Sequence, residues 1–401
     1  MGRRREEIIS RARTLPSIRT LSDGVPVVQK AQGSRLYDVD NVGFIDYTGG
    51  HGTAIVGFAN QFVQDAAKKV LANGVPSGAA GPMDVELAES LEHFLPWVQT
   101  WWLCRDEDFA IRRAVAWARA TTRRGGILTV GTVFRTDPSM SRSSEQPTVR
   151  VVPDWAVDKV EAAVTAGASR LAAVVVDPLM TAAGLIPASG EALTRIADVC
   201  RRSGVLLIMD ERIAGFRVHR GGACGLHGIE PDAAVYGGAL AGGFPIGAIG
   251  FREPVELHGS ILPGTGAGQP HALAVGAADA VLSILKNDSM YQRLDERTEQ
   301  LVEGVLALAE RFSRPMSVNR QGSVFCLYMT DRGVTDVPSV EAADAEAYAR
   351  LATALRDEGV LLPPDSGTAA FVSSAHGAKD VEETLVAFER VLLKLHQEDL
   401  P

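Results

Sequence analysis

The stretch GVLLIMD, residues 204–210, decides the fold class of this chain, because it is a short apolar run that ends in an aspartate. A second run of this kind, LAAVVVD at residues 171–177, comes before it, and the residues between them contain a helical pattern. Apolar strands that alternate with helices are typical of a mostly parallel sheet covered by helices. Ligands gather at the carboxyl ends of such strands, so Asp177 and Asp210 are predicted to border a site. For Asp177, capping of the following turn is an equally good interpretation.

The pattern changes after Phe312, where short strands begin to mix with helices. Strands are expected over 323–329 and 369–374, and helices over 345–359 and 381–395. We therefore predict an α/β protein with a large domain over residues 46–287 and a smaller α+β domain over residues 288–401. The N-terminal segment, residues 1–45, is expected to pack with the small domain. Further helices are predicted over residues 83–95, 192–203 and 290–312.

Composition limits the classes of function. The 401 residues are 46% hydrophobic and 22% charged, with a formal net charge of −9, so a nucleic-acid partner is not expected. No continuous apolar stretch is long enough for a signal peptide or a membrane span, and we expect neither export nor a membrane partner. The cysteines lack metal-ligand spacing and disulfide density, which favours a reducing cytoplasm and no metal site; they are Cys104, Cys200, Cys224 and Cys326.

Six motifs occur in an order and spacing that resemble one enzyme family. They are SRLYDVDNVGFIDYTGG (34–50), VPSGAAGPMDVELAESL (75–91), MDERIAGFRVHRGGA (209–223), GGFPIGAIG (242–250), GTGAGQPHALAVGAADAVL (264–282) and FVSSAH (371–376). The chain resembles class III aminotransferases, and glutamate-1-semialdehyde aminomutases in particular, over nearly its whole length. The resemblance implies the fold-type I architecture of pyridoxal phosphate (PLP) dependent transferases. It also implies a homodimer with the active site at the subunit interface.

The chemistry of that family needs a lysine whose amine forms a Schiff base with the cofactor. The family places this lysine just before a glycine-rich turn, and the matching segment here reads VYGGALAGGFPIGAIG. Gly238 stands at the matching position, and the chain has no lysine between Lys159 and Lys286. The resemblance therefore implies that the catalytic lysine is missing.

Other cofactor positions of the family are also changed. Where the family holds the phosphate at a helix N-terminus, this chain has Asp106, Glu107 and Asp108, which would repel it. Val133 stands in place of the aromatic residue that stacks on the pyridine ring. Thr265 matches the residue that reaches the phosphate from the neighbouring subunit. The ancestral PLP site is therefore predicted to be lost, with no cofactor in its place.

Asp210 and Arg212 suggest that the cavity has a new use. Asp210 matches the partner of the pyridine nitrogen, while Arg212 replaces a valine that packs on the ring. Arg212 can pair with Asp210 or with the acidic residues 106–108, or it can bind a carboxylate substrate. His51 stands where the family has a tryptophan beside the substrate, and histidine can carry protons near neutral pH.

We therefore predict a PLP-independent enzyme, an isomerase, lyase, hydrolase or cyclase, that acts on a small polar metabolite, with a place in specialised metabolism as a further conjecture. Asp210, His51 and Glu107 would carry protons, and Arg212 would anchor an anion. A catalytically silent paralogue that binds a ligand or a partner subunit is one alternative. A class III aminotransferase or aminomutase that binds PLP non-covalently is another.

Overall fold

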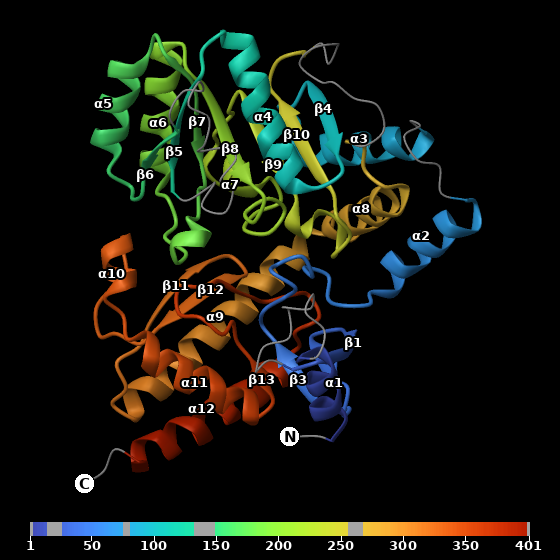
Figure 1. Cartoon of the computed structure of the whole chain (residues 1–401), viewed down its shortest axis with the longest axis vertical. Coiled ribbons are helices and arrows are strands. Elements are labelled where there is room, and N and C mark those ends of the chain that lie inside the picture. Colours follow the sequence, from blue (N-terminus) through green and yellow to red (C-terminus); the bar gives the residue numbers. More distant parts are fainter. Residues whose placement is uncertain (1–2, 14–25, 75–80, 132–148, 256–267, 399–401) are drawn as a thin grey trace.

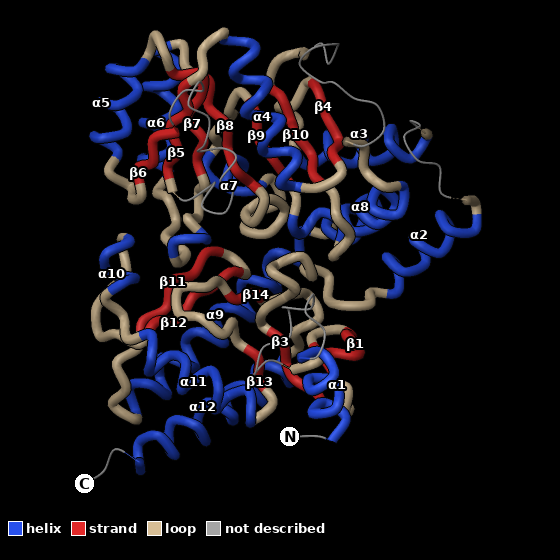
Figure 2. The backbone as a smooth tube through the Cα atoms, viewed as in Figure 1, coloured by secondary structure: helices blue, strands red, loops and turns tan. Residues whose placement is uncertain are grey.

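A seven-stranded sheet forms the core of the larger part of the molecule (Figures 1 and 2). The computed structural model describes residues 3–13, 26–74, 81–131, 149–255 and 268–398. Across the sheet the strand order is β4 (Thr100–Cys104), β10 (Gly247–Phe251), β9 (Ala233–Tyr236), β8 (Leu206–Glu211), β7 (Leu171–Val176), β5 (Gly126–Val130) and β6 (Val149–Val152). Strand β10 alone runs opposite to the other six strands, so the predicted α/β class with a mostly parallel sheet is confirmed.

Helices cover both faces of this sheet, as its sequence predicts. All six residues of β7 are buried, because a β-branched run without polar alternation suits a strand that is covered on both sides. On one face, α4 packs Ile111 and Val115 against Ile208 of β8. On the other face, α6 contributes Leu193 and Ile196. The helices of this part are α2 (Gln61–Ala72), α3 (Pro82–Phe94), α4 (Glu107–Thr122), α5 (Val157–Gly167), α6 (Gly190–Ser203), α7 (Gly222–His227) and α8 (Ala272–Leu285), with short 3₁₀ turns η2 (Thr181–Ala183) and η3 (Gly238–Ala241).

The C-terminal part is a smaller α+β unit that also includes the N-terminal strands. Strand β3 (Gly43–Asp46) pairs in parallel with β13 (Val360–Leu361), so strands from the N-terminal and C-terminal parts of the chain share a sheet of order β1-β2-β3-β13. A second sheet has the order β11-β12-β14. The remaining elements are α1 (Arg3–Arg13), β1 (Val28–Gln32), β2 (Arg35–Asp38), α9 (Asp288–Arg311), β11 (Ser317–Gln321), β12 (Val324–Tyr328), α10 (Val337–Glu341), α11 (Ala345–Asp357), β14 (Ala370–Phe371) and α12 (Ala378–Glu398).

Two expectations from the sequence concern membrane spans and disulfide bonds. Within the described ranges, no helix combines the length and the apolar character that crossing a membrane requires. All four cysteines lie in those ranges, and each is buried with a free thiol. The cytoplasmic location and the domain bounds remain predictions.

Candidate functional site

The candidate site lies where β7, β8 and β9 end at the same edge of the large sheet. Parallel strands bring their carboxyl ends together, so Asp177 after β7, Asp210 in β8 and Gly238 after β9 come from adjacent strands. Strand β4 is antiparallel to β10 and therefore ends at this edge too. Two residues separate β4 from α4, so the N-terminus of α4 faces the same region.

Arg212 and Asp210 form a two-pronged ion pair at this edge. Nε of Arg212 lies 2.8 Å from Oδ1 of Asp210, and Nη2 lies 2.8 Å from Oδ2. Asp210 is only 6% exposed and the Arg212 side chain 17%. Burial lowers the pKa of Arg212, but the charge and hydrogen bonds of Asp210 outweigh it, helped by Glu107 and Asp108, and the pKa is raised above its ordinary value. Arg212 was expected either to pair with an aspartate or to bind a carboxylate substrate, and the structure shows the pairing with Asp210.

Arg212 also links β8 to the start of α4. Its Nη1 donates to Oδ1 of Asp108 at 2.8 Å, although Asp108 is 68% exposed. Asp106 is the N-cap of α4 and accepts a hydrogen bond from the N–H of Phe109 at 2.6 Å. Its other oxygen lies 3.1 Å from Nε of Arg105. The acidic residues at 106 and 108 therefore serve as a helix cap and as ion-pair partners.

Glu107 turns inward and contacts the turn after β9. Its Oε2 accepts a hydrogen bond from the backbone N–H of Gly238 at 2.6 Å. Burial raises the pKa of the Glu107 carboxyl, while the Gly238 N–H and the charge of Arg212 act in the opposite direction. Glu107 thus connects the turn after β9 to the first turn of α4.

Asp177 lies beside this group but caps its own turn. Its carboxylate accepts hydrogen bonds from the N–H groups of Leu179 and Thr181, each at 3.0 Å. Burial, together with the charge of Asp210, raises the pKa of Asp177 to about 6. The contacts of Asp177 are therefore those of a residue that caps the turn after β7.

The predicted catalytic histidine is not part of this cluster. His51 lies on an exposed turn with φ of 58°. Its charge acts on the pKa of Asp46, and within the described residues His51 shares no hydrogen bond with Asp210 or Glu107. Val133 and Thr265 lie outside the described residues. The catalytic roles assigned to Asp210, Arg212, His51 and Glu107 stay predictions.

Glu211 is a buried acid that the sequence did not single out. It is fully buried, and its two oxygens accept hydrogen bonds from the N–H groups of Ala223 at 3.0 Å and Cys224 at 2.7 Å. Burial raises the pKa of Glu211 to about 7. The sequence MDERIAG could have indicated this burial, because Glu211 directly follows Asp210 in a strand. Successive strand residues face opposite sides of a sheet, so the Glu211 side chain points away from the site and into the protein.

Comparison with known proteins identifies similar chains. Residues 22–373 match the family model for class III aminotransferases. The chain is 32% identical to a glutamate-1-semialdehyde 2,1-aminomutase from Sulfurihydrogenibium azorense, over 89% of each chain. It is also 32% identical to glutamate-1-semialdehyde 2,1-aminomutase 2 from Brevibacillus brevis, over 92% of each.

Solved structures show the same fold. A glutamate-1-semialdehyde aminomutase from Pseudomonas aeruginosa PAO1, a lysine-to-alanine variant in complex with PMP, superposes with a TM-score of 0.81 at 24% identity. The match covers 92% of this chain and 88% of the other. A transaminase with PLP bound superposes with a TM-score of 0.86 at 24% identity, over 99% of each chain.

These findings correct two predictions made from the sequence. The prediction that the protein has no cofactor is wrong, because the matched family and the PLP-bound structural neighbours indicate a PLP cofactor. The prediction of PLP-independent acid–base catalysis is wrong for the same reason, and the alternative of a silent paralogue loses its basis with it. The error came from treating altered contacts as the loss of the cofactor itself.

The described residues nevertheless do not fit PLP in the family's usual covalent mode. Gly238 has no amine to form a Schiff base. At the α4 N-terminus the Asp106 carboxylate already caps the helix, and Asp108 is tied to Asp210 through Arg212. Since these carboxylates would repel a phosphate, the arrangement does not fit a phosphate group at the α4 N-terminus.

Proposed function

Because the chain belongs to the class III aminotransferase family, we propose that it is an aminotransferase or aminomutase whose PLP or pyridoxamine phosphate (PMP) is held without a covalent bond to lysine. The observation that carries this proposal is the placement of the lysines. None lies in the turns after β8 and β9 or just before α4. They are Lys30 on β1, Lys68 and Lys69 on α2, Lys159 on α5, Lys286 after α8, and Lys379 and Lys394 on α12.

A related structure supports non-covalent binding. The aminomutase from Pseudomonas aeruginosa was solved with PMP although one of its lysines is replaced by alanine. PMP carries an amine where PLP carries an aldehyde, so it forms no Schiff base with a lysine. A binding site on this scaffold can therefore depend on shape, hydrogen bonds and charge alone.

Asp210 is the residue that we propose for cofactor contact. The family resemblance puts it opposite the pyridine nitrogen, and its place at the end of β8 agrees with the usual position of ligands in such sheets. In the present arrangement both of its oxygens are taken by Arg212. Cofactor binding therefore requires the Arg212 side chain to move off Asp210.

The proposed substrate is a small polar amino or oxo acid with a carboxylate group. The curated relatives are glutamate-1-semialdehyde aminomutases, and their shared name indicates a small polar substrate. Once it leaves Asp210, Arg212 would present a planar fork that suits a carboxylate. The Arg212 side chain would then pair with Asp210 when no ligand is bound and with the substrate carboxylate when the ligands are bound.

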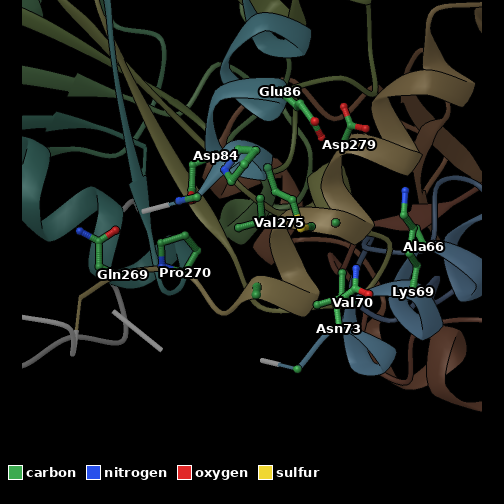
Figure 3. Close-up of a pocket in the computed structure, with 16 residues that line it drawn as sticks. Ala66, Lys69, Val70, Asn73, Asp84, Glu86, Gln269, Pro270, Val275 and Asp279 are labelled. Atoms are coloured by element: carbon green, nitrogen blue, oxygen red, sulfur yellow. The ribbon is translucent and has the colours of Figure 1, made fainter. Parts of the chain in front are cut away.

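We also propose that the protein is a homodimer. A groove of about 400 Å³ lies between α2, α3 and α8; Figure 3 shows Val70, Asn73, Asp84 and Val275 at its walls. On the helices that line the groove, Phe62 and Leu71 of α2 and Val85 of α3 are 57%, 58% and 58% exposed. Exposed apolar side chains on these helices favour a protein partner, and the resemblance implies a second copy.

Ligand-dependent unfolding tests the proposed function. A ligand at a hundred times its dissociation constant stabilises the native state by about 2.7 kcal/mol, which shifts Tm by a few degrees. We expect PMP and PLP each to raise the Tm of the wild-type protein. Asp210→Asn should lose most of this shift, and Asp198→Asn, a surface control on α6, should keep it. No shift with either ligand, or an equal shift in Asp210→Asn, would count against the proposal.

A further inference from the structure

The turn between β9 and η3 has a backbone shape that suits glycine. Gly238 has φ of +45°, a left-handed backbone conformation that is energetically unfavourable for most residues other than glycine. Its N–H is held by Oε2 of Glu107 at 2.6 Å. This single hydrogen bond fixes the turn against the first residue of α4.

The space around the turn is also closed to side chains. A Cβ at position 238 would lie 2.4 Å from the backbone oxygen of Arg212, and a Cβ at position 237 would lie 2.4 Å from Oε2 of Glu107. Both distances are below any normal carbon–oxygen contact, so the Glu107 side chain would have to shift for a Cβ at position 237, and the backbone for a Cβ at position 238. Because the first obstacle is a main-chain atom of the turn after β8, a change of rotamer cannot relieve it.

We infer that Glu107 is a positioning residue that holds Gly238 in a shape incompatible with a lysine, so that covalent cofactor attachment requires changes at both positions. The inference rests on the proposed non-covalent binding and extends it to a specific pair of residues. When Glu107 is removed, the N–H of residue 238 loses its partner. The turn is then free to rotate residue 238 away from the Arg212 carbonyl.

Covalent attachment at residue 238 would follow ordinary Schiff-base chemistry. A lysine amine attacks the aldehyde carbon of PLP, a C=N bond forms and water leaves. Borohydride then gives hydride to that carbon, solvent supplies a proton to the nitrogen, and a stable secondary amine remains. The mass of the reduced chain therefore reports covalent attachment, independently of any catalytic activity.

The experiment compares Gly238→Lys, Glu107→Ala and the double variant for Tm and for reduced PLP adduct, with peptide mapping of the modified residue. Gly204→Lys is the matched control, because Gly204 has φ of +58° but no atom within 4 Å of the place that a Cβ would take. We expect Gly238→Lys to lower Tm by several degrees more than Gly204→Lys and to form little adduct at residue 238. The double variant should recover part of the lost Tm and form the adduct. Glu107→Gln, which keeps an acceptor oxygen, should not rescue Gly238→Lys.

Alanine variants keep the inference testable if the lysine variants do not fold. Gly238→Ala and Glu107→Ala should show non-additive changes in Tm, since Glu107 holds the turn in the shape in which a Cβ at residue 238 meets the Arg212 carbonyl. Additive changes, or a Gly238→Lys protein of wild-type stability that forms the adduct alone, would overturn the inference and leave non-covalent binding by the wild type standing. Failure of PMP to stabilise the wild type would instead remove the proposed function, while the Tm comparison would still measure the Glu107–Gly238 link.

Discussion

Arg212 places two guanidinium nitrogens at 2.8 Å from the two carboxylate oxygens of Asp210, and its third nitrogen at 2.8 Å from Asp108. These contacts join the end of β8 to the start of α4. Asp210 is therefore satisfied without a ligand. A ligand that uses the Asp210 carboxylate must therefore replace the contacts of Arg212.

Replacing Arg212 by valine should weaken the free protein and strengthen cofactor binding. Asp210 would be left buried without its partner, which costs about 3–5 kcal/mol for a fully buried pair and less here, because Arg212 is 17% exposed. The free variant should unfold at a lower temperature, but PMP should raise its Tm by more than it raises that of the wild type. Arg212→Lys, which keeps the charge without the fork, should show a smaller gain. Equal PMP shifts in all three proteins would contradict the blocking role of Arg212.

Replacing Asp106 by serine should separate the capping of α4 by Asp106 from the effect of its negative charge on phosphate binding. Serine caps helices as well as aspartate does, so the stability of α4 should change by less than about 1 kcal/mol. One negative charge disappears from the α4 N-terminus, where the family resemblance puts the phosphate, and the affinity for PMP should rise by roughly tenfold at low salt. Isothermal titration calorimetry measures the change, with Asp106→Ala as the variant that also loses the cap. An unchanged affinity would place the phosphate elsewhere.

Glu211 should make the protein less stable as pH rises. Its pKa is raised to about 7 from an ordinary value of 4.5, so the native state binds more protons than the unfolded state between these values. The stability that this group contributes is therefore fully present below pH 4.5 and is lost as pH rises through about 7, by about 3 kcal/mol in total. Thermal unfolding from pH 5 to pH 8 should show a larger decrease for the wild type than for Glu211→Gln. Identical slopes would contradict the raised pKa.

The exposed apolar residues of α2 give a test of the homodimer. Phe62→Glu together with Leu71→Glu puts two charges on a surface that we propose to be buried against a second copy. Light scattering after size exclusion should give a dimer mass for the wild type and a monomer mass for the variant. Val386→Glu on α12, a change at another exposed apolar residue, should leave the dimer intact. A monomeric wild type would contradict the proposal.

Much of the fold could be predicted from the sequence, because buried strands and amphipathic helices leave direct patterns. The expected strands at 171–177 and 204–210 correspond to β7 and β8 within two residues at each end. The pairing of Arg212 with an aspartate was among the expected possibilities, since a buried guanidinium needs a carboxylate.

The contact between Glu107 and Gly238 could not be predicted. It joins positions 131 residues apart, and a backbone N–H donor leaves no trace in the sequence. The cofactor prediction failed for a different reason. Changed side chains report which contacts differ from those of the family, whereas binding depends on the whole scaffold, which this chain shares with PLP-bound transaminases.

The most direct test of non-covalent cofactor binding is equilibrium dialysis of the wild-type protein against PLP, followed by borohydride reduction and intact mass measurement. Non-covalent binding predicts PLP retained by the protein at dialysis equilibrium and a chain of unmodified mass after reduction. A chain that carries one reduced adduct in stoichiometric amount, or a protein that retains no PLP, would contradict it.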